Sequence, residues 1–448
     1  MRPFEQDGGG VSASAAGSGH GVSRKVSHDG HDVLLTEVFF PEISEWRPVL
    51  ERLGVSQQAA IAAAVRAREH ACDFQSALLA DALADRSDLL RAVAAELGLD
   101  VVETIDPERI VITQENAITL LRGRNGRVPV KLMGRSGDVA FLISSERLRL
   151  DAMRRQMAAH PSLARHLRLV DPQILRQAIL EHARPLLTRR AVTGLGERYP
   201  AFSARIVANA WQGMTIGTTM TLVPVGLLLA RSSVLAVSHV IATVFFFACV
   251  SLRFAAAASI QPPRPPASIP MPEGEKPVYS VLVALYQEAA IVPSLIAALD
   301  RLVWPRDRLD IKLVCEEGDT GTLAVIGALE LPPHIEVVVV PRRGPKTKPK
   351  ALAYALQMAG GEFVVLYDAE DSPHPMQLIE AWQRFCQAGP DLAAIQAPLE
   401  ISNGNANLLA RMFAFEYAGL FRGLLPWLSQ RRLMLPLGGT SNHFRDVM

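Results

Sequence analysis

The segment between Arg205 and Arg253 carries almost no charge. Among its 47 residues the only Lys, Arg, Asp or Glu is Arg231, although charged residues make up 20% of the chain. It divides into 18 uncharged residues, 213–230, and 21 uncharged residues, 232–252. An apolar helix of about 20 residues can cross a bilayer. We therefore predict a two-helix transmembrane hairpin over 213–252 with Arg231-Ser-Ser as its tight loop; a buried hairpin of a soluble protein is the alternative.

Basic residues flank this apolar segment on both sides. Arg253 and Arg264 follow it, and five arginines precede it: Arg184, Arg189, Arg190, Arg198 and Arg205. Short segments rich in Lys and Arg remain on the cytoplasmic side of a membrane. We therefore expect a protein of the inner (cytoplasmic) membrane with both soluble parts in the cytoplasm.

Composition bounds the remaining parts of the chain. Residues 1–40 are rich in Gly, Ser and His without the apolar core of a signal peptide, and we predict a disordered tail. Residues 253–276 contain Gln261-Pro-Pro-Arg-Pro-Pro, which indicates a stiff Pro-rich linker. The 46 basic and 45 acidic side chains balance, so we expect no nucleic-acid partner. The four cysteines form no CxxC pair, which gives no support to a zinc or redox motif.

Residues 41–170 predict a small α/β domain. Ser56 and Ser87 are candidate N-caps of two helices, and Gly98 is a candidate C-terminal stop for the second. Two short β-like runs follow, from Val128 and from Asp138. Residues 171–212 are expected to be a helical linker toward the membrane.

The phrases LLRAVAAELGLDVVETID and VPVKLMGRSGDVAFLIS resemble the N-terminal domain of type II secretion ATPases. Some members of that family bind cyclic di-GMP through a repeated Arg-Leu-Gly element ahead of apolar helices. Here Arg52-Leu-Gly is followed by Val55-Ser-Gln-Gln, and the second expected position reads Phe74-Gln-Ser-Ala. We therefore expect the fold without cyclic di-GMP binding, and a possible role of this domain is to bind a protein partner.

From residue 277 the pattern changes to alternating strands and helices. Strand-like runs begin at Tyr279, Asp310, Ile335 and Gly361, which predicts a mostly parallel sheet with flanking helices. Ligands of such sheets bind at the C-terminal ends of the strands. Acidic residues follow three of these runs: Glu288; Glu316 and Asp319; and Asp368, Glu370 and Asp371. Clustered carboxylates repel one another unless a cation or a donor-rich ligand offsets the repulsion.

The acidic trio Asp368, Glu370 and Asp371 predicts a site for a hard divalent ion. Mg²⁺ and Mn²⁺ prefer oxygen ligands and complete their shell with substrate phosphates. The run Arg342-Arg-Gly-Pro-Lys-Thr-Lys-Pro-Lys350 supplies five cations just before a helix start, where phosphates bind well. A solvated loop is the alternative for this run when it is taken alone.

Residues 277–448 resemble glycosyltransferase family 2, the inverting GT-A type, and in particular its large bacterial membrane-bound members. The matching phrases are YSVLVALYQEAAIVPSLIAAL, WPRDRLDIKLVCEEGDTGT, TKPKALAYAL, GEFVVLYDAEDSPHP and LPLGGTSNHFR. The resemblance implies a nucleotide-sugar donor and a carbohydrate or lipid-linked acceptor. Ala353 stands where many relatives carry Asn, which removes one expected contact on the nucleotide side.

The same resemblance implies roles for individual residues. It implies that the nucleotide-sugar donor is bound by Glu288, Glu316, Asp319, Lys350 and Asp368. Asp368 and Glu370 match the DxD metal motif with Asp371 beside them, and the acceptor side falls to Gly438, Gly439, Thr440, Ser441 and Asn442. Relatives place the catalytic base farther along the chain, and we expect that base beyond Met448.

These features predict a membrane-bound glycosyltransferase for surface polysaccharide or exopolysaccharide, with Mg²⁺ or Mn²⁺ as cofactor. With the base expected beyond Met448, the chain is expected to bind donor but to transfer sugar slowly or not at all. The alternative is a non-catalytic membrane anchor with a degenerate transferase domain, in which the N-terminal domain is the working part.

Overall fold

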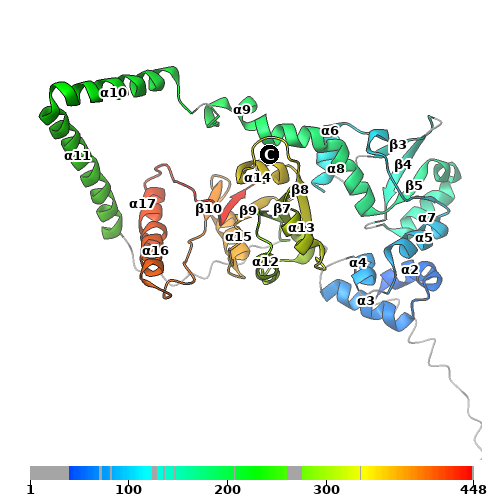
Figure 1. Ribbon diagram of the computed structural model, residues 1–448. Helices are drawn as coiled ribbons and strands as arrows, with labels where there is room; N and C mark the ends of the chain where they lie inside the picture. Colours follow the sequence, from blue (N-terminus) through cyan, green and yellow to red (C-terminus); the bar gives the residue numbers. More distant parts are fainter. Residues whose placement is uncertain are drawn as a thin grey trace, which may run out of the picture.

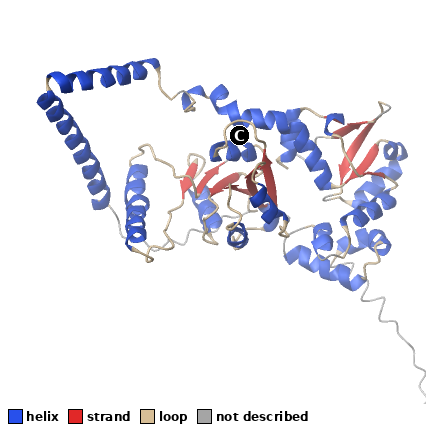
Figure 2. Ribbon diagram, viewed as in Figure 1, coloured by secondary structure: helices blue, strands red, loops and turns tan. Residues whose placement is uncertain are grey.

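The computed structural model describes residues 40–69, 73–80, 83–123, 129–134, 137–145, 148–205, 207–259, 275–332 and 334–445. The predicted tail before residue 40 and most of the predicted Pro-rich linker lie outside these residues. The described chain forms an N-terminal α/β domain, two long apolar helices and a C-terminal α/β domain (Figure 1). Its two sheets lie in separate parts of the molecule (Figure 2).

The N-terminal domain begins with four helices: α2 (Pro41–Arg52), α3 (Gln57–Glu69), α4 (Phe74–Ala80) and α5 (Arg86–Leu97). Ser56 caps α3 by accepting a hydrogen bond from the Ala59 N–H, as predicted. The cap of α5 is Asp85 rather than Ser87, because the Asp85 carboxylate accepts the Ser87 N–H and places Ser87 inside the first turn. Gly98 ends α5 with a left-handed φ of 64°, as predicted.

The remaining elements of this domain form a mixed sheet and its covering helices. The sheet has the order β1-β5-β4-β3-β2. Its strands are β1 (Asp100–Val102), β2 (Ile110–Val111), β3 (Val130–Met133), β4 (Val139–Ser144) and β5 (Leu167–Val170). The helices are α6 (Gln114–Leu121), α7 (Leu150–Ala159) and α8 (Pro172–Arg189).

The C-terminal domain has six strands in the order β10-β11-β9-β6-β7-β8. β6 (Tyr279–Leu285), β7 (Leu309–Glu316), β8 (Ile335–Val340) and β9 (Phe363–Tyr367) are parallel. β11 (Asn442–Arg445) is antiparallel to both β9 and β10 (Ala394–Gln396). The helices are α12 (Val292–Asp300), α13 (Thr320–Gly327), α14 (Lys348–Leu356), α15 (Gln377–Ala388), α16 (Leu408–Gly419) and α17 (Leu425–Gln430). The mostly parallel α/β class predicted from the sequence is confirmed.

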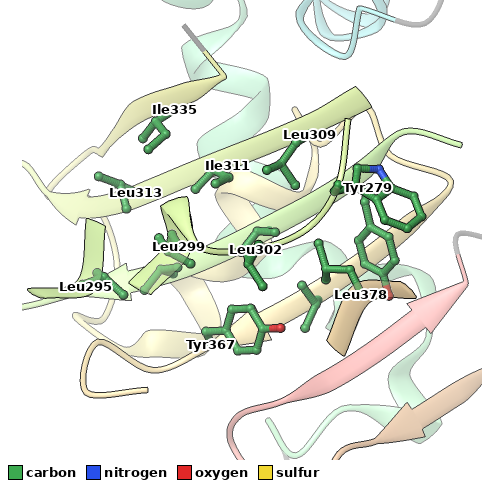
Figure 3. Packing of buried hydrophobic residues seen from close by; sticks show 14 of the residues in the cluster. Tyr279, Leu295, Leu299, Leu302, Leu309, Ile311, Leu313, Ile335, Tyr367 and Leu378 are labelled. Atoms are coloured by element: carbon green, nitrogen blue, oxygen red, sulfur yellow. The ribbon is translucent and has the colours of Figure 1, made fainter. Parts of the chain in front are cut away.

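Side chains that alternate along each strand supply two separate cores. On one face Val281 and Val283 of β6 belong to one buried cluster with Leu295 and Leu299 of α12 and Leu378 of α15. Figure 3 shows Leu295, Leu299 and Leu378 in this cluster. On the other face Leu282 packs with residues of β7, β8 and α14.

The second core continues into the N-terminal domain. Ala178, Ile179, Ala183 and Leu187 of α8 belong to the same buried cluster as Tyr354 of α14. Residues 171–189, predicted as part of a linker, therefore form a helix that packs on the C-terminal sheet. A short π-helical segment, Arg190–Gly194, and α9 (Leu195–Arg198) carry the chain onward.

Polar contacts fix this junction between the two domains. Arg176 of α8 donates two hydrogen bonds to Glu336 of β8, at 2.6 and 2.7 Å. Lys312 of β7, whose side chain is 3% exposed, contacts Glu336 at 2.6 Å. Burial opposes ionisation of Glu336, but Lys312 and Arg176 outweigh burial and lower the pKa of this carboxyl to about 2. The charges thus tie α8 to two strands of the sheet.

The two apolar helices are α10 (Ala210–Leu229) and α11 (Arg231–Ala258), and both are long and apolar enough to cross a membrane. The predicted loop Arg231-Ser-Ser is wrong, because Arg231 begins α11 and only Ala230 lies between the helices. Gly226 permits this sharp corner, since a Cβ there would lie 2.8 Å from Val234. α11 also continues past the predicted end at residue 252, because Ala255–Ala258 favour a helix. The helices diverge from the corner (Figure 1), and their pairing as a hairpin stays a prediction.

We predict that Glu336→Gln destabilises the protein by about 1.5–3 kcal/mol near neutral pH, because it removes one of the two carboxylates, Glu336 and Asp310, that contact the buried Lys312. The pKa of Glu336 is depressed, so its contribution is present above its usual pKa of 4.5 and is lost as pH falls toward about 2. The stability of the variant should therefore depend less on pH in that window. Thermal unfolding of detergent-solubilised protein measures both effects.

Asp88→Asn is the matched control, since Asp88 pairs with Arg91 on an exposed helix surface. It should change stability by less than about 1 kcal/mol. An equal loss in the two variants would contradict a role for Glu336 at the domain junction.

Candidate functional site

Three acidic segments meet at one edge of the C-terminal sheet, as predicted. β6, β7 and β9 run in parallel, so Glu288, Glu316 and Asp368 follow or end strands at the same edge. Their charges act on one another: burial raises the pKa of Glu288, and repulsion from Glu370 and Asp319 adds to that shift. The site is therefore a negatively charged edge that needs cations.

One cation of the predicted basic run is already committed to this edge. Lys350 in the first turn of α14 contacts Glu316 at the end of β7, with Nζ–O distances of 2.9 and 3.0 Å. Both side chains are buried, and Lys350 also donates to the Pro341 carbonyl at 3.3 Å. Lys350 and Glu316 therefore bind each other in this structure. Their contacts with a nucleotide remain a prediction.

Asp319 holds the neighbouring loop in place. Its carboxylate accepts hydrogen bonds from the Gln287 N–H at 2.6 Å and from the Thr322 N–H at 3.2 Å, which caps α13. Burial disfavours the charged form of Asp319, but these hydrogen bonds prevail and lower its pKa. Gln287 lies in the left-handed region with φ of 59°. Asp319 thereby fixes the turn that carries Glu288.

Glu288 is an acceptor available to a ligand. Its backbone N–H donates to the Thr322 hydroxyl at 3.1 Å, and one carboxylate oxygen is buried without a hydrogen-bond partner. Burial is the main cause of its raised pKa. A buried acceptor of this kind is costly unless a donor reaches it.

Asp368, Lys348 and the Gly438–Asn442 loop form one connected cluster. The Lys348 ammonium pairs with the Asp368 carboxylate and donates to the Gly439 carbonyl at 3.1 Å. The Asp368 N–H donates to Asp371 at 2.8 Å and to the Thr440 hydroxyl at 3.0 Å, and that hydroxyl also contacts Asp371. The predicted metal motif and the predicted acceptor loop are therefore adjacent.

The predicted acidic trio does not converge on one point. Asp371 is turned back to the Asp368 backbone and to Thr440, whereas Glu370 is exposed. Across the described part of the chain, no three His, Cys, Asp or Glu side chains are grouped to hold a metal ion. Asp368 and Glu370 keep the oxygen ligands that suit Mg²⁺ or Mn²⁺. Asp371 fits better as the residue that shapes their turn.

Strand pairing places the acceptor-side loop. Asn442 pairs with Leu366 across β11 and β9, and Leu366 lies two residues before Asp368 in the chain. Ser441 has a left-handed φ of 55°, and its N–H donates to the Leu366 carbonyl at 2.7 Å. Gly438 approaches Gln396 so closely that a Cβ would lie 2.7 Å from its Nε2. Short side chains and tight turns thus let the loop pass close to the acidic edge.

Comparison with known proteins agrees with this geometry. Residues 277–441 match the model of the family "Glycosyltransferase like family 2". This part of the chain is a glycosyltransferase family 2-like domain. The match and the mostly parallel sheet agree with the GT-A-like class expected from the sequence.

Two curated relatives support the assignment of the transferase domain. A probable glycosyltransferase of Sulfolobus acidocaldarius is 26% identical over 153 residues, which are 33% of each chain. The probable glycosyltransferase YdaM of Bacillus subtilis is 28% identical over 147 residues, which are 32% of this chain and 34% of its own. The aligned part thus spans about a third of the length of either relative.

Solved structures match this chain with low TM-scores. A mannosyltransferase of Pyrobaculum calidifontis, in complex with GDP-Man and Mn²⁺, is 24% identical with a TM-score of 0.30, over 36% of this chain and 47% of its own. Glucosyl-3-phosphoglycerate synthase of Mycobacterium tuberculosis, with Mn²⁺ and UDP, is 17% identical with a TM-score of 0.24, over 38% of this chain and 56% of its own. Because both TM-scores are low, the assignment rests on the family match and the sheet.

Sequence reasoning missed two contributors to the site of the transferase domain. Lys348 was one cation among five in the basic run, and only the fold shows that it, rather than Lys350, contacts Asp368. The Thr322 hydroxyl supports Glu288 from a neighbouring helix. The helical spacing of Lys348 and Lys350 was the available signal, since residues two apart point in different directions.

We predict that Lys350→Met destabilises the protein by about 3–5 kcal/mol, because it leaves the Glu316 carboxylate buried without a partner. Lys348→Met should cost less than about 1 kcal/mol, since both members of its pair are partly exposed. Thermal unfolding of the two solubilised variants makes the comparison.

The double variant Glu316→Gln with Lys350→Met should recover part of the loss, because no buried charge remains unpaired. Equal losses of stability in Lys350→Met and Lys348→Met would show that the buried pairing with Glu316 is not the cause.

Proposed function

We propose that this protein is a membrane-bound glycosyltransferase that moves a sugar from a nucleotide-diphosphate donor to a carbohydrate or lipid-linked acceptor. The observation that carries the proposal is the cluster of Asp368, Lys348 and Thr440. It joins the metal motif, a phosphate-compatible cation and the acceptor-side loop at the ligand-binding edge of the sheet. A role in surface polysaccharide or exopolysaccharide synthesis fits such an activity.

The leaving group of this reaction is a nucleoside diphosphate, which gains negative charge as the sugar departs. A divalent ion, when bound, supplies Lewis-acid stabilisation for that charge. Asp368 and Glu370 would hold it. Lys348 lies in the first turn of α14, where its ammonium and the helix N-terminus both favour phosphate.

Lys348 has a second role in this proposal. Without donor it neutralises Asp368, and burial lowers the pKa of its ammonium while nearby carboxylates oppose that shift. When Asp368 instead contacts a cation, the Lys348 ammonium becomes available for the diphosphate. Glu288 would accept a hydrogen bond from the nucleoside, and Asp319 would hold the Gln287–Glu288 turn.

We expect Mn²⁺ or Mg²⁺ to strengthen binding of UDP or GDP at least tenfold, about 1.4 kcal/mol. Calorimetry on the detergent-solubilised chain, with metal or with EDTA, measures this difference. Asp368→Ala should abolish the metal effect because it removes a ligand. Glu380→Ala, an exposed acidic change on α15, is the control and should keep the effect. The same gain in Asp368→Ala would rule out the assignment.

Turnover distinguishes the enzyme from the alternative of a non-catalytic anchor. Release of UDP or GDP from a nucleotide sugar, lost in Asp368→Ala and kept in Glu380→Ala, supports the transferase. Donor binding without release in membranes that contain acceptor lipids supports the anchor.

We also propose that α10 and α11 cross the inner membrane and leave both α/β domains in the cytoplasm. At 1.5 Å per residue, 20 residues reach about 30 Å, the thickness of the hydrocarbon core. None of the apolar windows of the two helices is buried in protein. The arginines on both flanks support the cytoplasmic placement, and the packing of α8 on the C-terminal sheet requires both domains on one side.

Reporter fusions after residue 205 and after residue 259 test this topology. Both fusions should report the cytoplasm, and a fusion after Ala230 should report the opposite side. Opposite results after residues 205 and 259 would mean that only one helix spans.

A further inference from the structure

The connection between β10 and β11 carries an exposed apolar surface beside the acceptor-side loop. It comprises α16, a π-helical segment Leu420–Leu424, α17 and the extended residues that follow, and we name it the 408–437 surface. Its exposed large apolar residues are Leu408, Leu409, Met412, Phe413, Phe415, Leu433, Met434, Leu435 and Leu437.

Helical spacing gathers the apolar residues of α16 on one side. Leu408, Met412 and Phe415 recur at intervals of four and three residues, with Leu409 and Phe413 beside them. Phe415 is 82% exposed and Met434 is 93% exposed. Contiguous exposed apolar patches of this kind mark contact sites for a membrane or a partner.

The end of α11 packs directly on this unit. Ala256 of α11 is buried, and a cavity of about 140 Å³ beside it is lined also by Ser259, Gly423 and Trp427. Arg253 of α11 approaches Glu416 of α16 at 3.7 Å. Figure 1 shows α16 and α17 next to the end of α11. The exposed apolar face of the candidate spanning helix and the 408–437 surface are therefore neighbours.

Charge favours a lipid surface as the occupant. Residues 408–437 contain one acidic residue, Glu416, and four arginines: Arg411, Arg422, Arg431 and Arg432. Arg431 lies 4.0 Å from the centroid of the Trp427 ring. Apolar residues combined with arginines and a tryptophan are typical of helices that lie at the boundary of headgroups and acyl chains. Anionic headgroups would complement the net positive charge.

The length of α11 agrees with this position. Its 28 residues reach about 42 Å, which exceeds a hydrocarbon core of about 30 Å. Its last turns, with Arg253, would therefore extend into the headgroup layer, where α16 and α17 meet them.

We propose that the 408–437 surface lies on the cytoplasmic face of the bilayer at headgroup depth. This inference rests on the proposed insertion of α11. The acceptor-side residues Gly438 and Gly439 follow the surface without a break, so the acceptor side of the site opens at the membrane surface. An acceptor anchored in the bilayer reaches such a site by lateral diffusion.

Site-specific fluorophores with lipid-borne quenchers test the proposal. Four variants of the full chain each carry one introduced cysteine at a position that is exposed in the structure. The substitutions are Phe415→Cys, Met434→Cys, Phe246→Cys in α11 and Met133→Cys in β3. Cys72, Cys249 and Cys386 are replaced by serine. Cys315 remains, since burial raises the pKa of its thiol to about 12 and keeps it unreactive near neutral pH. Each variant is labelled and reconstituted in phosphatidylcholine–phosphatidylglycerol vesicles.

Headgroup-attached nitroxides should reduce fluorescence roughly twofold at 415 and 434 and leave 133 unchanged, because only the first two positions lie at headgroup depth. Nitroxides at mid-chain should quench 246. Quenching at 246 without quenching at 415 and 434 would overturn the proposal and leave insertion of α11 intact. No quenching at 246 would overturn both. Self-quenching at 415 that increases with protein density, without lipid quenching, would show that a second copy covers the surface, which also overturns the proposal.

Discussion

The packing of α8 against the C-terminal sheet determines how the rest of this protein is arranged. One face of a parallel sheet is covered by its own helices α12 and α15, whereas the other is completed by α14 together with α8. An exposed half of that face would leave apolar strand residues in water. The N-terminal domain and the transferase domain therefore share one core, and the Glu336 contacts with Arg176 and Lys312 set their orientation.

Charge neutralisation organises the site at the edge of that sheet. Three acidic groups there already have a defined counterpart: Lys350 for Glu316, Lys348 for Asp368 and backbone N–H groups for Asp319. The buried pair is structural, because neither partner can leave without exposing a charge to a low-dielectric interior. The more exposed pair can exchange partners at lower cost. This difference in burial supports the proposed ligand response of Asp368 and Lys348, whereas the Glu316–Lys350 pair is held by its burial.

The apolar helices and the transferase site are linked by geometry as well as by sequence. α11 ends on the α16–α17 unit, which leads through residues 433–437 to Gly438 and the acidic edge. A membrane-embedded α11 therefore brings the acceptor side close to the lipid surface. The N-terminal domain lies on the opposite side of the sheet from α12 and α15.

Local pattern alone determined the four parallel strands of the transferase domain, because apolar runs such as Tyr279–Leu285 and acidic residues at strand ends are encoded within a few residues. The antiparallel strands β10 and β11 were not predicted, because the pairing of β10 with β11 and of β11 with β9 joins residues far apart in the chain. The family resemblance added the donor, metal and acceptor residues, and the fold confirms that Asp368 and Thr440 are neighbours. Only the tertiary structure decided that Lys348 rather than Lys350 contacts Asp368. The two side chains are two positions apart on a helix and therefore point in different directions. The tertiary structure also decided that Asp371 turns toward Thr440, and that α8 is a core helix, because its buried partners Val338 and Tyr354 lie more than 150 residues away in the chain.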